Sequence, residues 1–83
     1  MIDIVEENEI VSRNIKAVRA QRGYTQGQMA NMLNVSVPTY IKMENRPIEL
    51  KLVKIKMLAK VLKCSVSDFL IEDMFTSCFE KKY

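Results

Sequence analysis

The side chains of this chain that could do chemistry are mostly basic, and they gather in its middle. Residues 13–63 contain eleven Lys and Arg side chains against only Glu44 and Glu49, which gives this segment a net charge of +9. Residues 1–12 and 64–83 carry −4 and −2, so the overall charge of +3 hides an asymmetry. A concentrated positive segment is typical of a protein that binds a polyanion, although a solvated lysine-rich face gives the same pattern.

Catalytic chemistry has no comparable support in the sequence. The chain has no His, and its two cysteines, Cys64 and Cys78, lack the spacing of a metal site. There is no glycine-rich phosphate loop and no nucleophile with a plausible base. We therefore predict that the chain is not an enzyme and uses no cofactor and no metal. We expect both cysteines to be reduced core residues rather than a disulfide.

Length and composition predict one all-helical domain. The chain has 83 residues, 48% of them hydrophobic, with only two Gly and two Pro. No apolar run is long enough to cross a membrane, and the acidic first residues do not form a signal peptide. We therefore expect a cytoplasmic protein.

Residues 25–44 predict two short amphipathic helices separated by a tight turn. Thr25 and Ser36 are suited to cap the two helices, because a side-chain oxygen there accepts a free N–H of the first turn. Asn34 between them tolerates the left-handed conformation that a sharp helix exit needs. A helix pair of this kind can place its second helix in the major groove of DNA. Its apolar positions are Met29, Ala30, Leu33, Tyr40 and Met43.

Three further segments must hold this pair in place. A helix is predicted from about residue 9 to 21, although a capping box at Asp3 and Glu6 allows an earlier start, and Gly23 ends it. After a loop at 46–49, a helix over about 50–62 carries an apolar stripe, and Ser65 caps a short fifth helix. Residues 71–79 form a last amphipathic stripe. The stripe of the fourth helix is Leu52, Ile55, Leu58, Ala59 and Leu62.

The chain resembles the Cro/C1-type (Xre-like) helix-turn-helix family over roughly residues 11–70. The matching stretches are IKAVRAQRGYTQGQMANMLNVSVPTYIKMEN, LAKVL and SVSDFL. The resemblance implies a five-helix, lambda-repressor-like domain, encoded by a bacterium or a phage, to which this chain adds a C-terminal amphipathic helix. We expect an N-terminal extension over 1–10, the domain over 11–70 and a C-terminal segment over 71–83. Asn34 replaces the family's usual turn glycine.

The resemblance also implies which residues meet DNA. The base-reading face is expected at Val37, Pro38, Thr39 and Lys42. Backbone contacts are expected at Gln26, Ser36 and Arg46, and at Arg13 and Lys51 if those two face the groove. Val37 and Pro38 have no hydrogen-bonding side chain, so they can only pack against a thymine methyl group or exclude a bulkier pairing. We therefore expect weak direct readout, supplemented by DNA shape or A·T-rich sequence.

Glu44 is predicted to be a structural anchor that bonds the backbone or a base of the first or second helix. Tyr40 is predicted to face the core. Specific DNA binding generally needs two half-sites and so a two-fold homodimer. The expected interface is the C-terminal stripe, with Ile71, Met74, Phe75 and Phe79, unless this stripe folds back on its own domain. The alternative function is a helical protein-interaction module, of an antitoxin or anti-repressor type, with little or no DNA binding.

Overall fold

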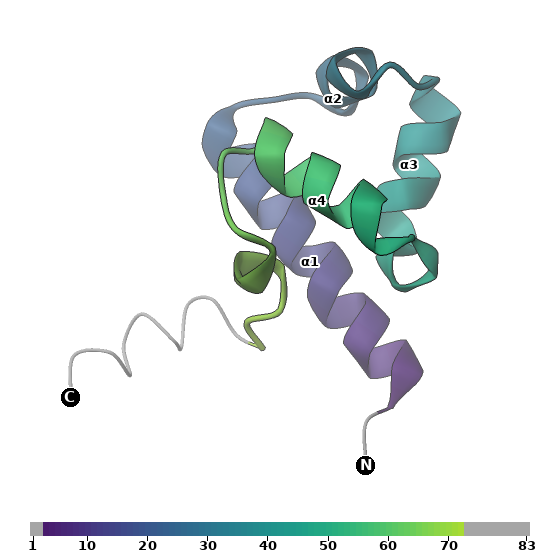
Figure 1. The fold of residues 1–83 in the computed structure, drawn as a ribbon, viewed down its shortest axis with the longest axis vertical. Coiled ribbons are helices and arrows are strands. Elements are labelled where there is room, and N and C mark those ends of the chain that lie inside the picture. Colours follow the sequence, from purple (N-terminus) through teal and green to yellow (C-terminus); the bar gives the residue numbers. More distant parts are fainter. Residues whose placement is uncertain (1–2, 73–83) are drawn as a thin grey trace, which may run out of the picture.

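A computed structural model describes residues 3–72, and every regular element in that range is helical (Figure 1). The predicted all-helical class is therefore confirmed for the described part. The short fifth helix is present as a 3-10 helix that begins after Ser65, so the count of five α-helices is not confirmed. From residue 73 onward, the predicted C-terminal helix lies outside the described residues. The elements are α1 (Ile4–Arg22), α2 (Gln26–Leu33), α3 (Val37–Asn45), the 3-10 helix η1 (Pro47–Glu49), α4 (Leu52–Val61) and the 3-10 helix η2 (Val66–Phe69).

The first helix, α1, is longer than the resemblance alone implies. It begins at Ile4 because the Asp3 side chain accepts a hydrogen bond of 3.0 Å from the Val5 amide and so caps the first turn. It ends at Gly23, which has a φ of 74° and whose amide bonds the Ala20 carbonyl. The expected boundary between an extension and the domain, at residues 10 and 11, therefore falls inside one continuous helix.

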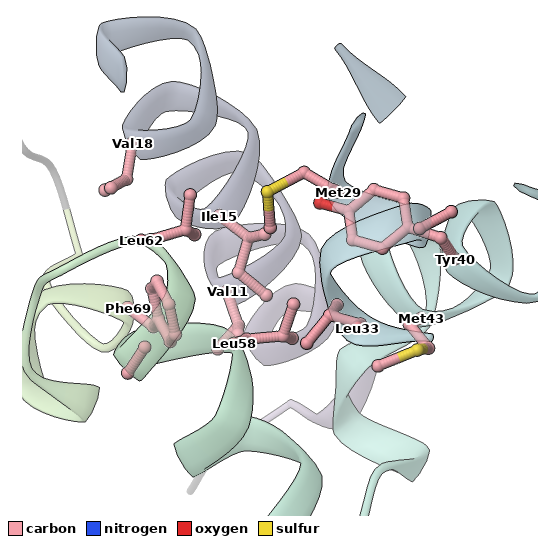
Figure 2. Packing of buried hydrophobic residues seen from close by; sticks show 12 residues of the cluster. Val11, Ile15, Val18, Met29, Leu33, Tyr40, Met43, Leu58, Leu62 and Phe69 are labelled. Carbon is pink, nitrogen blue, oxygen red and sulfur yellow. The ribbon is translucent and has the colours of Figure 1, made fainter. Parts of the chain in front are cut away.

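The core lies between α1, α2, α3, α4 and η2, each of which contributes buried side chains to one cluster (Figure 2). Figure 2 shows Ile15 of α1 surrounded by side chains of the other elements, among them Met29, Leu58 and Phe69. All four of these side chains are fully buried. Burying a side chain of this size contributes about 1.5–3 kcal/mol, so a domain this small depends on each of them. The buried cluster is Val11, Ile15, Val18, Met29, Ala30, Leu33, Tyr40, Met43, Leu58, Ala59, Leu62 and Phe69.

The apolar stripe predicted for the fourth helix is only partly correct. Leu58, Ala59 and Leu62 are buried, and Ile55 is half-buried, but Leu52 is 60% exposed. Leu52 is the first residue of α4, so it lies at the edge of the core although its spacing matches the buried positions. Within residues 3–72, no helix is both long enough and apolar enough to span a membrane.

Candidate nucleic-acid interface

The turn between α2 and α3 is built as its sequence predicts. Thr25 Oγ1 accepts from the Gln28 amide at 3.0 Å, and the Gln28 side chain accepts from the Thr25 amide at 2.8 Å. This reciprocal pair of bonds satisfies two free N–H groups at the start of α2. Asn34 ends α2 in the left-handed conformation, with a φ of 59°. These local bonds set the direction in which the chain enters α3.

The start of α3 leaves a hydroxyl donor pointing outward. The Ser36 side chain caps α3 by accepting from the Thr39 amide at 3.2 Å, and its own hydroxyl donates to Thr39 Oγ1 at 2.8 Å. Because Thr39 accepts from Ser36, its own hydroxyl proton has no partner among these bonds and can be donated elsewhere. Thr39 can therefore offer a hydrogen bond to an acceptor outside the protein, such as a purine N7.

The four predicted base-reading residues all lie on the exposed side of α3. Val37 is 44% exposed, and Pro38, Thr39 and Lys42 are exposed as well. Tyr40, between them in the sequence, is fully buried, as predicted. The outward side of α3 therefore carries the four residues that the resemblance implies, and the inward side carries Tyr40.

The inward face of α3 ends in a buried ionic cluster centred on Glu44. Arg19 of α1 donates to both carboxylate oxygens, with Nε to Oε2 at 2.7 Å and Nη2 to Oε1 at 3.2 Å. The Tyr40 hydroxyl donates to Oε2 at 2.6 Å, and the Gln26 amide donates to Oε1 at 3.1 Å. One carboxylate thus joins α1, α2 and α3. The prediction that Glu44 is a structural anchor is confirmed.

The protonation of this cluster follows from its hydrogen bonds. Burial by itself raises the pKa of Glu44, but the hydrogen bonds from Arg19, Tyr40 and Gln26 outweigh it and hold that pKa below its ordinary value. Burial also raises the pKa of Tyr40, and the bond to the Glu44 carboxylate raises it further. The bond to Glu44 raises the pKa of Arg19. Glu44 is therefore ionised at neutral pH while Tyr40 stays neutral.

Gln26 is the predicted phosphate-contacting residue whose side chain is most constrained. Its amide nitrogen must face Glu44, because an ionised carboxylate only accepts hydrogen bonds. The side chain is half-buried at the first position of α2. Glu44 therefore fixes the orientation of the Gln26 amide before any DNA binds. The sequence did not reveal this link, because Gln26 and Glu44 are eighteen positions apart.

A hollow of about 300 Å³ lies beside the exposed face of α3 and has basic side chains in its lining. It brings Thr39 and Lys42 together with Arg46, and it adds Lys54 of α4. We did not single out Lys54 from the sequence. The only available signal was its place three residues after Lys51 in a lysine-rich helix. The other lining residues are Val35, Met43, Glu49 and Leu50.

The other residues predicted to contact the DNA backbone are Arg46, Lys51 and Arg13, and of these only Arg46 lines the hollow beside α3. Arg46 is exposed after α3 and forms a solvent-facing ion pair with Glu49 at 3.3 Å. Lys51 is exposed at the start of α4. Arg13 lies on α1, where its guanidinium donates to the Glu72 carbonyl, and it is not among the residues lining the hollow beside α3.

Asn8 is a positioning residue that the sequence did not indicate. Its amide nitrogen donates to the Asn45 carbonyl at 3.0 Å, and its oxygen accepts from the Ile48 amide at 3.2 Å. Both partners flank Arg46, so Asn8 of α1 fixes the loop that carries this basic residue. Among the described residues, no group of three Cys, Asp or Glu side chains is placed to hold a metal ion.

Comparison with known proteins agrees with this geometry. A family model described as helix-turn-helix, of the Cro/C1 type, matches residues 15–69, about two thirds of the chain. No curated protein and no solved structure gave a match. The matched range covers the second half of α1, from residue 15, and all of the elements from α2 to η2. The chain therefore belongs to the Cro/C1-type helix-turn-helix family, a family of DNA-binding regulatory domains.

Proposed function

We propose that this protein is a sequence-specific, double-stranded DNA-binding transcription regulator that acts as a repressor. The observation that carries the proposal is the exposed face of α3, where Thr39 and Lys42 meet Arg46 and Lys54 around one hollow. Basic side chains of this kind neutralise phosphates, while the hydroxyl of Thr39 can contact a base edge. A compact domain bound at a promoter blocks access by occupying the DNA.

Readout in this proposal depends on a rigid α3. The Glu44 cluster ties α3 to α1 and α2, and the Ser36 cap fixes its first turn. Gln26 is oriented by Glu44 and sits at the start of α2, where a phosphate is favoured by the free amides of the first turn. We therefore propose Gln26 and Ser36 as backbone contacts, with Val37, Pro38, Thr39 and Lys42 as the reading residues.

We further propose that the regulator works as a homodimer. One domain of this size contacts only a few base pairs, and two copies reach two half-sites about one helical turn apart. The proposed interface is the C-terminal stripe. Met74, Phe75 and Phe79 lie outside the described residues, while Ile71 is half-buried and its carbonyl accepts from Asn14.

The test is a salt titration of binding to a pool of random duplex DNA, followed by sequencing of the enriched duplexes. We expect affinity to fall steeply with salt and an inverted repeat to be enriched, because each neutralised phosphate contributes about −0.9 to the log–log slope. Arg46→Ala, at a predicted backbone contact that lines the hollow, should make the slope shallower by about one phosphate contact. Lys60→Ala removes an exposed charge from α4 and serves as the matched control. Binding that ignores salt, or equal effects of the two substitutions, would contradict the proposal and favour a protein partner.

A further inference from the structure

The hollow beside α3 has two kinds of lining, and contact with the DNA backbone accounts for only one of them. Its less exposed lining residues are all apolar and form a floor, in which Met43 is buried and Val35 and Leu50 are half-buried. Phosphates are bound by hydrogen-bond donors, so they engage the rim and not the floor. The exposed lining residues, all polar, form this rim and are Thr39, Lys42, Arg46, Glu49 and Lys54.

The floor of the hollow is an outer boundary of the hydrophobic core. Met43 belongs to the buried cluster, and Val35 and Leu50 pack against it. These three residues come from the turn before α3, from α3 itself and from the end of η1, which joins α3 to α4 (Figure 1). A methionine side chain is unbranched and adapts its shape to its neighbours. An apolar group placed here therefore leaves water and contacts side chains that are already packed.

The rim of the hollow is positively charged, and its charges come from two helices. Lys42 belongs to α3 and Lys54 to α4, while Arg46 forms its exposed ion pair with Glu49. Three basic side chains against one carboxylate leave the rim with a net charge of +2. Within residues 3–72, neither lysine takes part in an ion pair. The rim therefore favours an anion, and hydrogen bonds from ammonium groups to a carboxylate are stronger than those between neutral groups.

The volume of the hollow limits the size of its occupant. Pockets that bind small molecules measure about 300–1,000 Å³, and this hollow, at about 300 Å³, lies at the lower end of that range. An apolar floor below a cationic rim is complementary to a molecule with a short apolar body and one anionic group. Neither an uncharged apolar molecule nor a small hydrophilic anion uses both parts.

We propose that the hollow beside α3 binds a small carboxylate with an apolar body, and that this ligand competes with DNA. The carboxylate is held between Lys42 and Lys54, and the apolar body rests on the floor at Met43. Thr39 and Lys42 line the hollow and are also proposed reading residues, so the ligand and DNA need the same side chains. Each then weakens the binding of the other by the same factor. Only this competition rests on the proposed function, because the ligand site itself does not require DNA.

The first test follows the methionine methyl groups by NMR while octanoate is added as the probe. Octanoate has the proposed chemistry, whereas acetate lacks the apolar body and 1-octanol lacks the charge. We expect the Met43 signal to reach saturation with octanoate at a concentration at least about tenfold lower than with either control compound. Met32 and Met57 are internal controls, because both are exposed and neither lines the hollow. Equal shifts at Met32 and Met57 would show non-specific binding and overturn the proposal.

Two lysine variants test the position of the carboxylate. Lys54→Gln removes one of its two proposed partners and should weaken octanoate binding at least about fivefold while leaving 1-octanol unaffected. Lys60→Gln is the matched control, because Lys60 is exposed on the same helix and does not line the hollow. An unchanged signal of Met29, which is fully buried in the core, verifies that both variants are folded. Equal effects of the two substitutions on octanoate binding would overturn the proposed site.

The last test measures competition with DNA. Binding of the enriched duplex is measured in octanoate and, as a control for ionic strength, in acetate at the same concentration. At about ten times its own Kd, octanoate should raise the apparent Kd for DNA roughly tenfold relative to acetate. An unchanged Kd would overturn the competition. A protein that binds octanoate beside Met43 but binds no DNA would contradict the proposed function, and with it the competition, but not the ligand site.

Discussion

Arg19 and Glu44 form a two-bond ion pair, at 2.7 and 3.2 Å, that crosses from α1 to the last turn of α3. The Glu44 carboxylate has no solvent exposure, and the Arg19 side chain is 19% exposed. A buried charge is costly unless every lone pair is engaged, and here four bonds from three residues converge on one carboxylate. The pair is therefore a fixed joint between the helix that supports the fold and the helix proposed to read DNA.

The first prediction concerns removal of this charge. Glu44→Gln keeps the volume but leaves the Arg19 guanidinium without its counter-ion, so we expect a loss of about 3 kcal/mol in the free energy of unfolding. Denaturant unfolding measures this loss. Glu49→Gln breaks the exposed ion pair with Arg46 and is the control, with an expected change within about 0.5 kcal/mol. Similar losses in both variants would show that the Glu44 cluster does not stabilise the fold.

The second prediction is that the free energy of unfolding is highest between two pH limits, an acid limit set by Glu44 and an alkaline limit set by Tyr40. The pKa of Glu44 is lowered on folding. Glu44 therefore contributes fully to the free energy of unfolding above its ordinary pKa of 4.5, and this contribution is lost as pH falls through the pKa of the folded state. The pKa of Tyr40 is raised on folding, so its contribution is complete below 10.0 and is lost as pH rises above that value.

Unfolding free energies measured across the pH range test each limit separately. We expect Glu44→Gln to flatten the acid limb and Tyr40→Phe to flatten the alkaline limb, and each to weaken the opposite limb to a smaller extent, because each group shifts the pKa of the other. If Tyr40→Phe left the alkaline loss unchanged, other groups would be responsible for it.

The local parts of this fold could be predicted because their causes are local. Thr25, Ser36 and Asn34 act on neighbours within four residues, so their types and spacing were sufficient. Glu44 could be assigned a structural role because it falls at a position that packs inward. Its partners could not be deduced, since Arg19 and Gln26 approach it only after α1 and α2 have packed.

The features that were not predicted depend on where an element ends relative to the core. Leu52 has the spacing of a buried residue, yet it lies in the first turn of α4 at the edge of the core. Lys63 adopts a φ of 56°, and Arg22 donates to the carbonyls of Leu62 and Lys63 across forty and forty-one positions. Periodicity gives the face on which a residue lies but not how far the neighbouring element extends.

The third prediction contrasts the two glycines. Gly27 lies in the first turn of α2, where an added Cβ meets only Thr25 Oγ1 at 3.8 Å, so Gly27→Ala should stabilise the protein by about 0.5 kcal/mol. Gly23 ends α1 with a φ of 74°, so Gly23→Ala should destabilise it by about 1 kcal/mol, although space is available. Thermal unfolding of both variants measures the signs. A lower Tm in Gly27→Ala than in the unchanged protein would contradict the prediction for this position.

The fourth prediction concerns which side chains of α3 select bases. Thr39→Val removes the hydroxyl donor and should reduce discrimination at one base pair of the enriched site by about tenfold, which corresponds to roughly 1–3 kcal/mol per good contact. Val37 and Pro38 can only make apolar contacts, so replacing both with Ala should weaken a preference for thymine without changing the salt slope. Sequencing of bound random duplexes measures both effects.

The two variants distinguish direct readout of bases by α3 from readout of DNA shape. If specificity comes mainly from DNA shape, base preferences outside the α3 contacts should persist in both variants, because bending and groove width are sensed through the phosphates. If Val37 and Pro38 carry no readout, their double substitution leaves the enriched sequences unchanged, and the hypothesis of thymine packing is wrong. Loss of all preference after Thr39→Val alone would instead assign direct readout to a single hydroxyl at the start of α3.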